Sequence, residues 1–343
     1  MLSQPRFLRR IAAFSPPALA FMPVPANAHV KWFCAFDVAG APVGLETVLC
    51  AEFEQLVALS LCLLVVGCII EGTPLGAALL RSLDSVTGPV RKHADLVVRV
   101  VAGGFFLTVG TTMNVFLTPE LVTDIAFVPW MQVGMAAAML SRRTLPLASL
   151  GIVLLFGLSV AQYGAFHLLD YPVFLGLAAY FACTGLGRSP LDIRPLDLVR
   201  WAAAVTLMWA SIEKWAYPQW THPMFIAHPN LSFGFDIAFY MQAAGVVEFA
   251  LAFALLWTPL VRRCSAIILG AAFVAAIGEF GLVDAIGHSC IIVVLLVIAA
   301  DDAKAPVRKR TVMLMPVGYA AALTGFLGAY YGLHSMLFTT GAS

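Results

Sequence analysis

The chain has 343 residues, of which 61% are hydrophobic and only 11% are charged, and its mean hydropathy is +0.91. Soluble domains average about 25% charged residues, so this composition excludes a water-soluble fold and indicates an integral membrane protein. The 20 basic and 19 acidic residues nearly cancel, which removes any global electrostatic argument for a nucleic-acid partner. The lipid bilayer is therefore the first expected partner.

Residues 1–28 have the pattern of a secretory signal peptide. Three arginines precede an apolar stretch, and Ala26-Asn27-Ala28 supplies the small residues of a cleavage site. Pro16 and Pro17 interrupt the apolar stretch, and an uncleaved membrane anchor is the alternative. Cleavage would start the mature chain at His29, outside the cytoplasm.

Ten apolar segments follow, most of them near the length of about 20 residues that a helix needs to cross a bilayer. They lie near residues 54–70, 97–117, 125–141, 144–163, 168–184, 197–215, 236–257, 260–281, 283–300 and 313–338. The pattern predicts an all-α, multi-pass transmembrane bundle of about ten helices.

Lysine and arginine set the orientation, because cytoplasmic loops collect these residues. With the mature N-terminus outside, the inner loops lie near 71–96, 142–143, 185–196, 258–263 and 301–312. These loops and the adjoining helix ends hold nearly all the basic residues, whereas Lys31 and Lys214 fall on the outer side. We therefore expect a protein of the cell inner membrane with a periplasmic N-terminus.

Two blocks of the chain share landmarks in the same order. One block opens at Asp95 and the other at Asp197, each with the run Asp-Leu-Val. The later pairs are Trp130-Met131-Gln132 and Tyr240-Met241-Gln242, Arg142-Arg143 and Arg262-Arg263, and Gln162-Tyr163-Gly164 and Glu279-Phe280-Gly281. A duplicated four-helix unit, with an axis along the membrane normal, produces such a pattern. Chance similarity of Ala- and Leu-rich helices is the alternative.

These observations divide the chain into six parts. They are the signal peptide (1–28), a short periplasmic segment (29–53), the first helix with a cytoplasmic loop (54–94), four-helix repeat 1 (95–190), four-helix repeat 2 (191–300) and a C-terminal transmembrane helix (301–343).

Short motifs in the second block carry a family resemblance. Its first helix starts with Arg200, its second contains Gly245-Val246-Val247-Glu248, and a basic turn leads to a third helix that ends at Gly278 to Gly281. On these motifs the chain resembles the DoxX-like (DoxX/DoxD-type) bacterial membrane proteins over residues 195–300, and more faintly over 95–184. The resemblance implies an inner-membrane protein, and some of these families are associated with quinone-linked oxidoreductase systems.

The histidines lie mostly on one side of the predicted topology. Of seven, only His93 is cytoplasmic, and imidazole is the commonest ligand for zinc, copper, iron and nickel. The alternative is that histidine favours membrane interfaces, as other amphipathic residues do. The candidate metal ligands are His29, His167, His222, His228 and His288.

Copper is the metal that this pattern favours most. If cleavage follows Ala28, the free α-amino group and the imidazole of His29 can chelate one ion together, and a second histidine would complete the tetragonal geometry that copper(II) prefers. The outer loop 217–230 offers two His-Pro pairs, at His222 and His228, with Met224 and several aromatic residues nearby. Interfacial anchoring is the alternative role of that loop.

Ionisable residues inside a membrane are costly and are candidates for function. The candidates for proton or ion handling are Glu213, Lys214, Glu248, Glu279 and Asp284. Glu213 and Lys214 are adjacent and point about 100° apart on a helix, so Glu279 or Asp284 is the expected partner of Lys214. Charges that only fasten helices together are the alternative.

The cysteines show no redox or zinc-binding spacing. Cys34 and Cys50 lie in the outer N-terminal segment, where an oxidising compartment permits a disulfide. The other five are expected to be packing residues. Phosphate-loop, HExxH and GxSxG motifs are also missing from the sequence, so no motif assigns an enzyme activity.

The sequence leaves three functions open. The first is a periplasm-facing surface that binds or transfers a transition metal, copper above all, with a periplasmic metal carrier as partner. The second is a quinone-associated subunit of an oxidoreductase system, partnered by a respiratory complex, with Trp209, Trp215 and Tyr217 lining a quinone pocket. The third is a non-catalytic membrane assembly protein.

Overall fold

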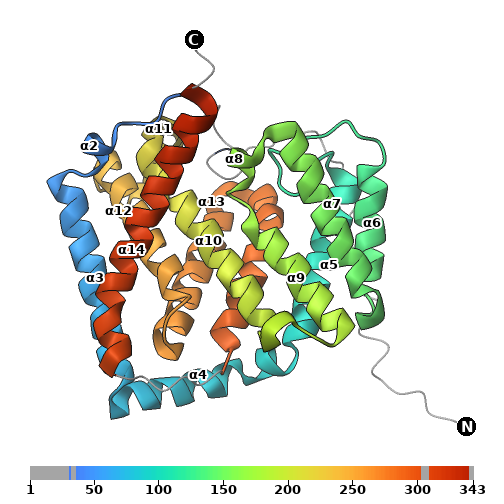
Figure 1. Cartoon of the computed structure of the whole chain (residues 1–343), viewed down its shortest axis with the longest axis horizontal. Helices are drawn as coiled ribbons and strands as arrows, with labels where there is room; N and C mark the ends of the chain where they lie inside the picture. Colours follow the sequence, from blue (N-terminus) through green and yellow to red (C-terminus); the bar gives the residue numbers. More distant parts are fainter. Residues whose placement is uncertain (1–30, 32–35, 303–308, 340–343) are drawn as a thin grey trace, which may run out of the picture.

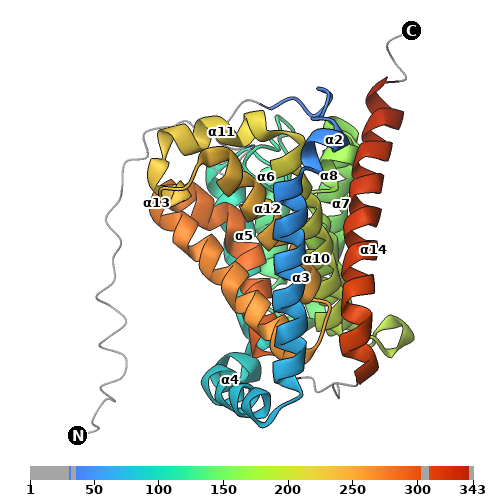
Figure 2. The same cartoon turned by 90° about the vertical axis from the view of Figure 1, so that its left-hand side faces the viewer.

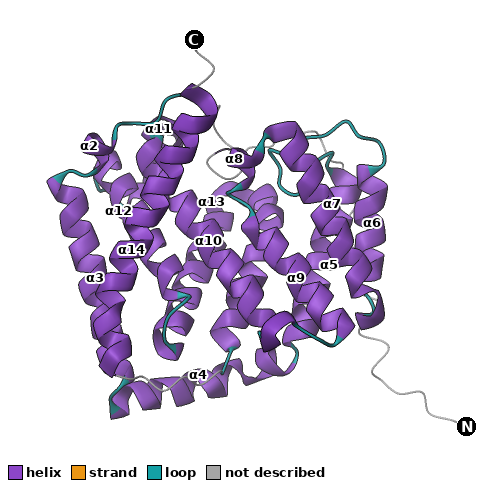
Figure 3. Cartoon of the chain, in the orientation of Figure 1, coloured by secondary structure: helices purple, strands orange, loops and turns teal. Residues whose placement is uncertain are grey.

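The computed structural model describes residues 31, 36–302 and 309–339, and its upright helices stand side by side in one bundle (Figure 1). Within these residues every regular element is a helix, apart from one isolated β-bridge between Val115 and Val122 (Figure 3). The described chain is therefore all-α, as the sequence predicts.

The helices follow one another with short connections. Their bounds are α2 Leu45–Val48, α3 Ala51–Glu71, α4 Pro74–Lys92, α5 Ala94–Thr112, α6 Val128–Ala138, α7 Leu145–Tyr163, α8 Ala165–Leu168, α9 Pro172–Leu186, α10 Pro195–Ala216, α11 Pro218–Ala227, α12 Ile237–Ala254, α13 Pro259–Ala300 and α14 Lys309–His334. Proline opens five of them, because its missing N–H would have no helical partner in the first turn.

Helix α13 consists of two limbs that fold back on each other at Gly281. This glycine has φ +75°, a backbone conformation that side-chain-bearing residues rarely adopt. On either side of it the limbs run antiparallel, since the rings of Phe273 and His288 lie 4.7 Å apart. Near the limb ends, Arg263 Nε donates to the carbonyl of Ala299 at 2.8 Å. The limbs are residues 259–280 and 282–300.

Six helices in the described part of the chain are long and apolar enough to cross a membrane, namely α3, α5, α7, α12, α13 and α14. Each of the ten predicted segments overlaps a helix, and the segments 260–281 and 283–300 match the two limbs of α13. The helices α6 and α9 are shorter, and α10 carries four charged residues. The structure thus shows a bundle with several membrane-length helices, and the count of ten stays a prediction.

The predicted inner loop 71–96 is largely helical. Thr73 caps α4 by accepting a hydrogen bond from the Gly76 N–H, and Pro74 occupies the first helical position. The helix lies across the lower end of the bundle, at the foot of α3, in both views (Figure 2). Its polar composition explains why it lies there and not among the upright helices, since Arg91 and Lys92 end it.

The two predicted blocks share structural details. Arg99 donates to the carbonyl of Met139, just after α6, and Arg200 donates to the carbonyl of Leu255, just after α12, each at 3.1 Å. Gly164 ends α7 with φ +84°, as Gly281 ends the first limb of α13 with φ +75°. These are the shared features that a duplication would produce.

Helix α10 lies at the centre of the bundle, packed between α9 and α12. The ends of the bundle that the sequence predicts to be cytoplasmic and periplasmic are called inner and outer here. The inner end of α10 is held by ion pairs, because Arg194 binds both Asp197 and Asp301. Arg262 of α13 binds the same Asp301 at 3.2 Å. Its outer end carries Glu213 and Lys214, so this helix positions the candidate site described below.

We expect Arg263→Ala to destabilise the bundle at its inner end. The Arg263 side chain is 2% exposed and binds Asp84 at 2.7 Å, in addition to the Ala299 carbonyl. Breaking a buried ion pair costs about 3–5 kcal/mol, and the loss here should lie at the low end because Asp84 is 32% exposed. Thermal unfolding in detergent measures the effect. Arg143→Ala, at the corresponding but exposed position, is the control, and an equal loss in both would contradict the expectation.

Candidate functional site

A buried ion triad lies at the outer ends of α9 and α10. The Lys31 ammonium binds the Asp170 carboxylate and also Glu213 Oε1, the latter at 2.6 Å. The three side chains are at most 10% exposed. The Lys31 Nζ also lies 5.5 Å from the ring centre of Trp220 and 5.9 Å from that of Phe36, so aromatic faces complete its surroundings.

Local structure explains why these groups meet. Asp170 lies in the turn before Pro172, which opens α9, and Glu213 lies in the last turn of α10. Burial lowers the pKa of Lys31, but the charges of the two carboxylates outweigh it, so the pKa is raised above the ordinary lysine value. The lysine therefore stays charged.

A second polar group, next to the triad, contains Glu120, His167 and Tyr171. The Tyr171 hydroxyl and the Thr118 hydroxyl both donate to Glu120 Oε1. Burial, followed by the nearby carboxylates, raises the pKa of Tyr171 well above its ordinary value, which keeps this donor protonated. His167 Nε2 lies 3.9 Å from the same Glu120 oxygen, too far for a direct hydrogen bond.

Three buried atoms of these two groups have no hydrogen-bond partner among the described residues. They are Glu120 Oε2, His167 Nε2 and Asp170 Oδ1. An unsatisfied buried polar atom costs about 1–3 kcal/mol, so atoms of this kind are favoured places for water or for a proton. These unpaired atoms distinguish the cluster from ion pairs that only hold helices together.

The second ion pair joins Lys214 of α10 to Glu248 of α12. Both side chains are about a fifth exposed, and Glu248 lies near the middle of its helix. The sequence-based expectation that Glu279 or Asp284 neutralises Lys214 is wrong. Glu279 binds His228 and Asp284 binds His288, because the helix rotations place those carboxylates next to histidines.

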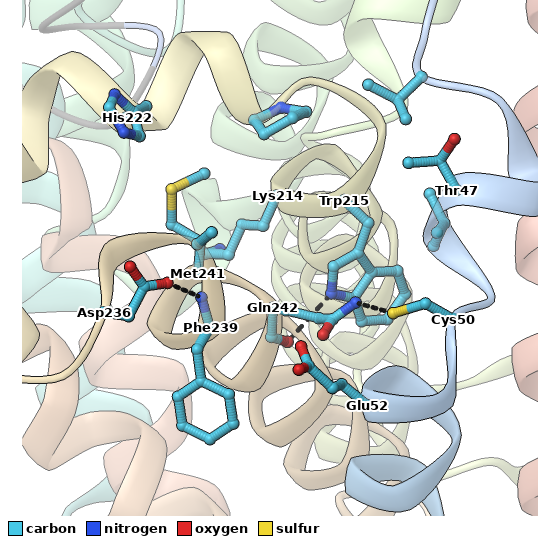
Figure 4. A pocket seen from close by; sticks show the side chains of 14 residues that line it. Thr47, Cys50, Glu52, Lys214, Trp215, His222, Asp236, Phe239, Met241 and Gln242 are labelled. Atoms are coloured by element: carbon cyan, nitrogen blue, oxygen red, sulfur yellow. Dashed lines mark hydrogen bonds between the residues drawn. The ribbon is translucent and has the colours of Figure 1, made fainter.

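Lys214 faces a cavity of about 290 Å³ at the outer ends of α3, α10 and α12, named here the outer cavity (Figure 4). Trp215, Gln242 and Cys50 surround the same space. Trp215 Nε1 donates to the Gln242 carbonyl at 3.2 Å, and Gln242 Nε2 donates to Cys50 Sγ at 3.3 Å. Most of the remaining lining is apolar, including Met241 and Phe239.

Cys50 directly precedes α3, at its N-cap position. The Gln242 amide, and then the backbone N–H of Phe53, lower the pKa of its thiol. Its predicted disulfide partner Cys34 lies outside the described residues, so that disulfide stays a prediction. Of the five cysteines expected to be packing residues, Cys68, Cys183 and Cys290 are buried, whereas Cys264 is half-buried and Cys62 is exposed.

The structure does not bring the four described candidate histidines together in one site. His167 faces Glu120, His228 Nδ1 binds Glu279 at 2.7 Å, His288 Nδ1 lies 3.0 Å from Asp284, and His222 lines the outer cavity. Across the described ranges, no group of three or more His, Cys, Asp or Glu side chains could hold a metal ion. His29 lies outside those ranges, so copper binding through it stays a prediction.

Sequence reasoning missed four residues of this site. Glu120 and Asp170 lie in short outer connections, and Lys31 and Tyr171 enter through contacts far apart in sequence. One signal was available, since an acidic residue in a short connection between two apolar segments is close to the membrane. The position of Lys31, one of only two basic residues on the predicted outer side, was a second.

Comparison with known proteins yields no match to a protein-family model, to a curated protein or to a solved structure. The DoxX-like resemblance therefore stays a prediction, and the function has to be argued from the geometry of the site.

We expect Lys31→Met to destabilise the protein by about 3–5 kcal/mol, because it leaves two buried carboxylates without a cation. Thermal unfolding in detergent, compared with Lys92→Met at an exposed position, measures the loss.

The pH dependence of the same variant has a definite sign. The raised pKa of Lys31 keeps its contribution present below the ordinary lysine pKa, and only strongly alkaline pH removes it. In Lys31→Met, protonation of the carboxylates relieves the uncompensated charge, so the loss should be smaller at about pH 5 than at about pH 8. A loss that is independent of pH would contradict this account of the triad.

Proposed function

We propose that the protein is a quinone-binding subunit of a membrane oxidoreductase system, and that the outer cavity holds the quinone head group. The observation that carries the proposal is the lining of this cavity, where apolar side chains surround hydrogen-bond donors such as Lys214 and Gln242. The carboxylates Glu52 and Asp236 line the same cavity. Sites for small organic ligands have this composition, and their volumes start at about 300 Å³. The 290 Å³ cavity is at the small end of that range, which suits one ring.

The donors match the chemistry of a quinone. A quinone ring presents two carbonyl oxygens, which accept hydrogen bonds, on an otherwise apolar frame. Lys214 offers a charged donor, and Gln242 keeps a second amide N–H besides the one that it gives to Cys50. The indole of Trp215 supplies an aromatic face.

The location also supports a lipophilic ligand. The cavity lies at one end of the membrane-length helices α3 and α12, where a ligand dissolved in the bilayer can enter from the side. Among the three aromatic residues expected to line a quinone pocket, Trp215 lies in the cavity. Tyr217 instead stacks on Trp220 at 3.9 Å, and Trp209 packs on Tyr330 at 4.8 Å.

The proposal includes the setting. It takes ten membrane crossings from the apolar segments, and an inner-membrane location with a periplasmic N-terminus from the predicted signal peptide and the distribution of lysine and arginine. This orientation would put the outer cavity on the periplasmic side. A respiratory complex is the kind of partner that would supply or use the electrons.

A binding measurement tests the proposal. A short-chain ubiquinone analogue is titrated into the purified protein in detergent, and the heat of binding gives Kd. Ala238→Trp fills the outer cavity from an exposed position at the start of α12, and we expect Kd to rise at least about tenfold, or about 1.4 kcal/mol. Lys214→Met removes a charged hydrogen bond and should raise Kd by about 10- to 100-fold.

The matched control is Ala227→Trp, which introduces the same side chain at an exposed position of α11 outside the cavity. Equal affinities in Ala238→Trp, Ala227→Trp and the unmodified protein would show that the quinone binds elsewhere or not at all.

A further inference from the structure

A second, smaller cavity of about 60 Å³ lies deeper in the bundle, between α9, α10, α12 and α13, and is named here the inner cavity. Its titratable lining residues are Asp170, Tyr171, Glu248, His288 and Cys290. A water molecule needs about 10–15 Å³ of such space and two to four polar partners, so the inner cavity has room for a short chain of waters.

The inner cavity lies between corresponding segments of the two predicted repeats. Tyr171 follows Gly164 by seven residues, and His288 follows Gly281 by seven; both residues line the cavity. Val173 and Cys290, each nine residues after the same two glycines, line it as well. A duplicated unit would place a shared cavity on the axis that relates its copies.

The two cavities meet at the Lys214–Glu248 ion pair. Lys214 lines the outer cavity, whereas its partner Glu248 lines the inner one. The inner cavity is also lined by Asp170, whose side chain is 2% exposed and whose Oδ1 atom has no hydrogen-bond partner in the described structure. Two carboxylates therefore face one space of water size.

We propose that water in the inner cavity carries protons between Asp170 and Glu248, and so connects the buried ion triad with the outer cavity. When Asp170 holds the proton as a carboxylic acid, it gives this proton to a first water, and the first water passes one proton to a second. The second water gives one proton to the Glu248 carboxylate. Asp170 is then a carboxylate and Glu248 a carboxylic acid, with the waters unchanged. The route rests on the proposed function in one respect, since its outer end serves a ligand beside Lys214.

The charges around the route leave room for this proton. Asp170 faces Lys31 and Tyr171, and Glu248 faces Lys214, with Glu213 sharing the Lys31 ammonium. These three carboxylates and two ammonium groups are neutral with one added proton, and an apolar environment favours the neutral set. The neighbouring Glu120 carboxylate, which accepts hydrogen bonds from the Tyr171 and Thr118 hydroxyls, adds a further negative charge beside the route. His288 in the same cavity already has its own carboxylate, Asp284, at 3.0 Å.

Infrared spectroscopy of the full-length protein in detergent tests the route. The one added proton gives a carboxylic-acid C=O band from Asp170 or from Glu248, according to which of them holds it. This band is followed after transfer to D2O at about pH 5 to 8, and the Glu248 contribution is identified by its loss in Glu248→Gln. If that variant does not fold, Glu248→Asp identifies the band by a shift. We expect a band that exchanges rapidly in the unmodified protein.

Filling the inner cavity should block the exchange. Ala210 lines this cavity, and Ala210→Leu should slow the exchange of the Glu248 band at least tenfold. Ala272→Leu, an exposed position of α13 outside the cavity, is the control and should exchange at the unmodified rate. Exchange at that rate in Ala210→Leu, or the absence of any exchangeable carboxylic-acid band, would overturn the proposal.

The quinone titration separates this proposal from the previous one. If the route is as described, Ala210→Leu leaves the Kd for the ubiquinone analogue unchanged and slows the exchange of the Glu248 band. If the exchange slows in Ala210→Leu but the unmodified protein binds no quinone, the result supports the route and contradicts the proposed ligand. If the protein binds the quinone and Ala210→Leu exchanges at the rate of the control, the result supports the proposed ligand and contradicts the route.

Discussion

The cost of a charge in apolar surroundings is the constraint on which the rest of this structure depends. Several of the charged residues lie inside the bundle, and most of those have a partner of opposite charge, whereas the buried Glu71 accepts a hydrogen bond from the backbone N–H of Val261. Lys31 joins the turn before α9 to α10, Lys214 joins α10 to α12, and Arg263 joins α13 to α4. The ion pairs therefore fasten particular helices to one another, and apolar packing joins the others, such as α7 with α9.

The central position of helix α10 follows from the cost of placing charges in apolar surroundings. It contributes charges at both ends, to the Arg194–Asp301 pair at the inner end and to the Lys31 triad and the Lys214 pair at the outer end. A helix with this many charges is stable in the bundle only when other helices surround it, and α9 and α12 flank it closely. The four charged residues of α10 therefore account for its central position in the bundle.

The sequence predicts the helices well because membrane-length apolar runs and basic loops are local features. Even the break between 260–281 and 283–300 is visible, because Gly281 interrupts the apolar pattern. The sequence does not predict which charged residues pair with one another. Lys31 meets residues 139 and 182 positions away, and Lys214 meets one 34 positions away. Helices that are apolar on every face, such as α12, give no periodicity from which the rotation of Glu248 could be derived.

The position of the Lys214–Glu248 pair between two cavities has a thermodynamic consequence. A ligand that accepts a hydrogen bond from the Lys214 ammonium competes with Glu248 for that ammonium, so ligand binding in the outer cavity weakens the ion pair. Ligand binding in the outer cavity and release of the Glu248 carboxylate into the inner cavity then favour each other by the same factor, as linkage requires. One ion pair is sufficient for this coupling, because Lys214 lines the outer cavity and Glu248 lines the inner cavity.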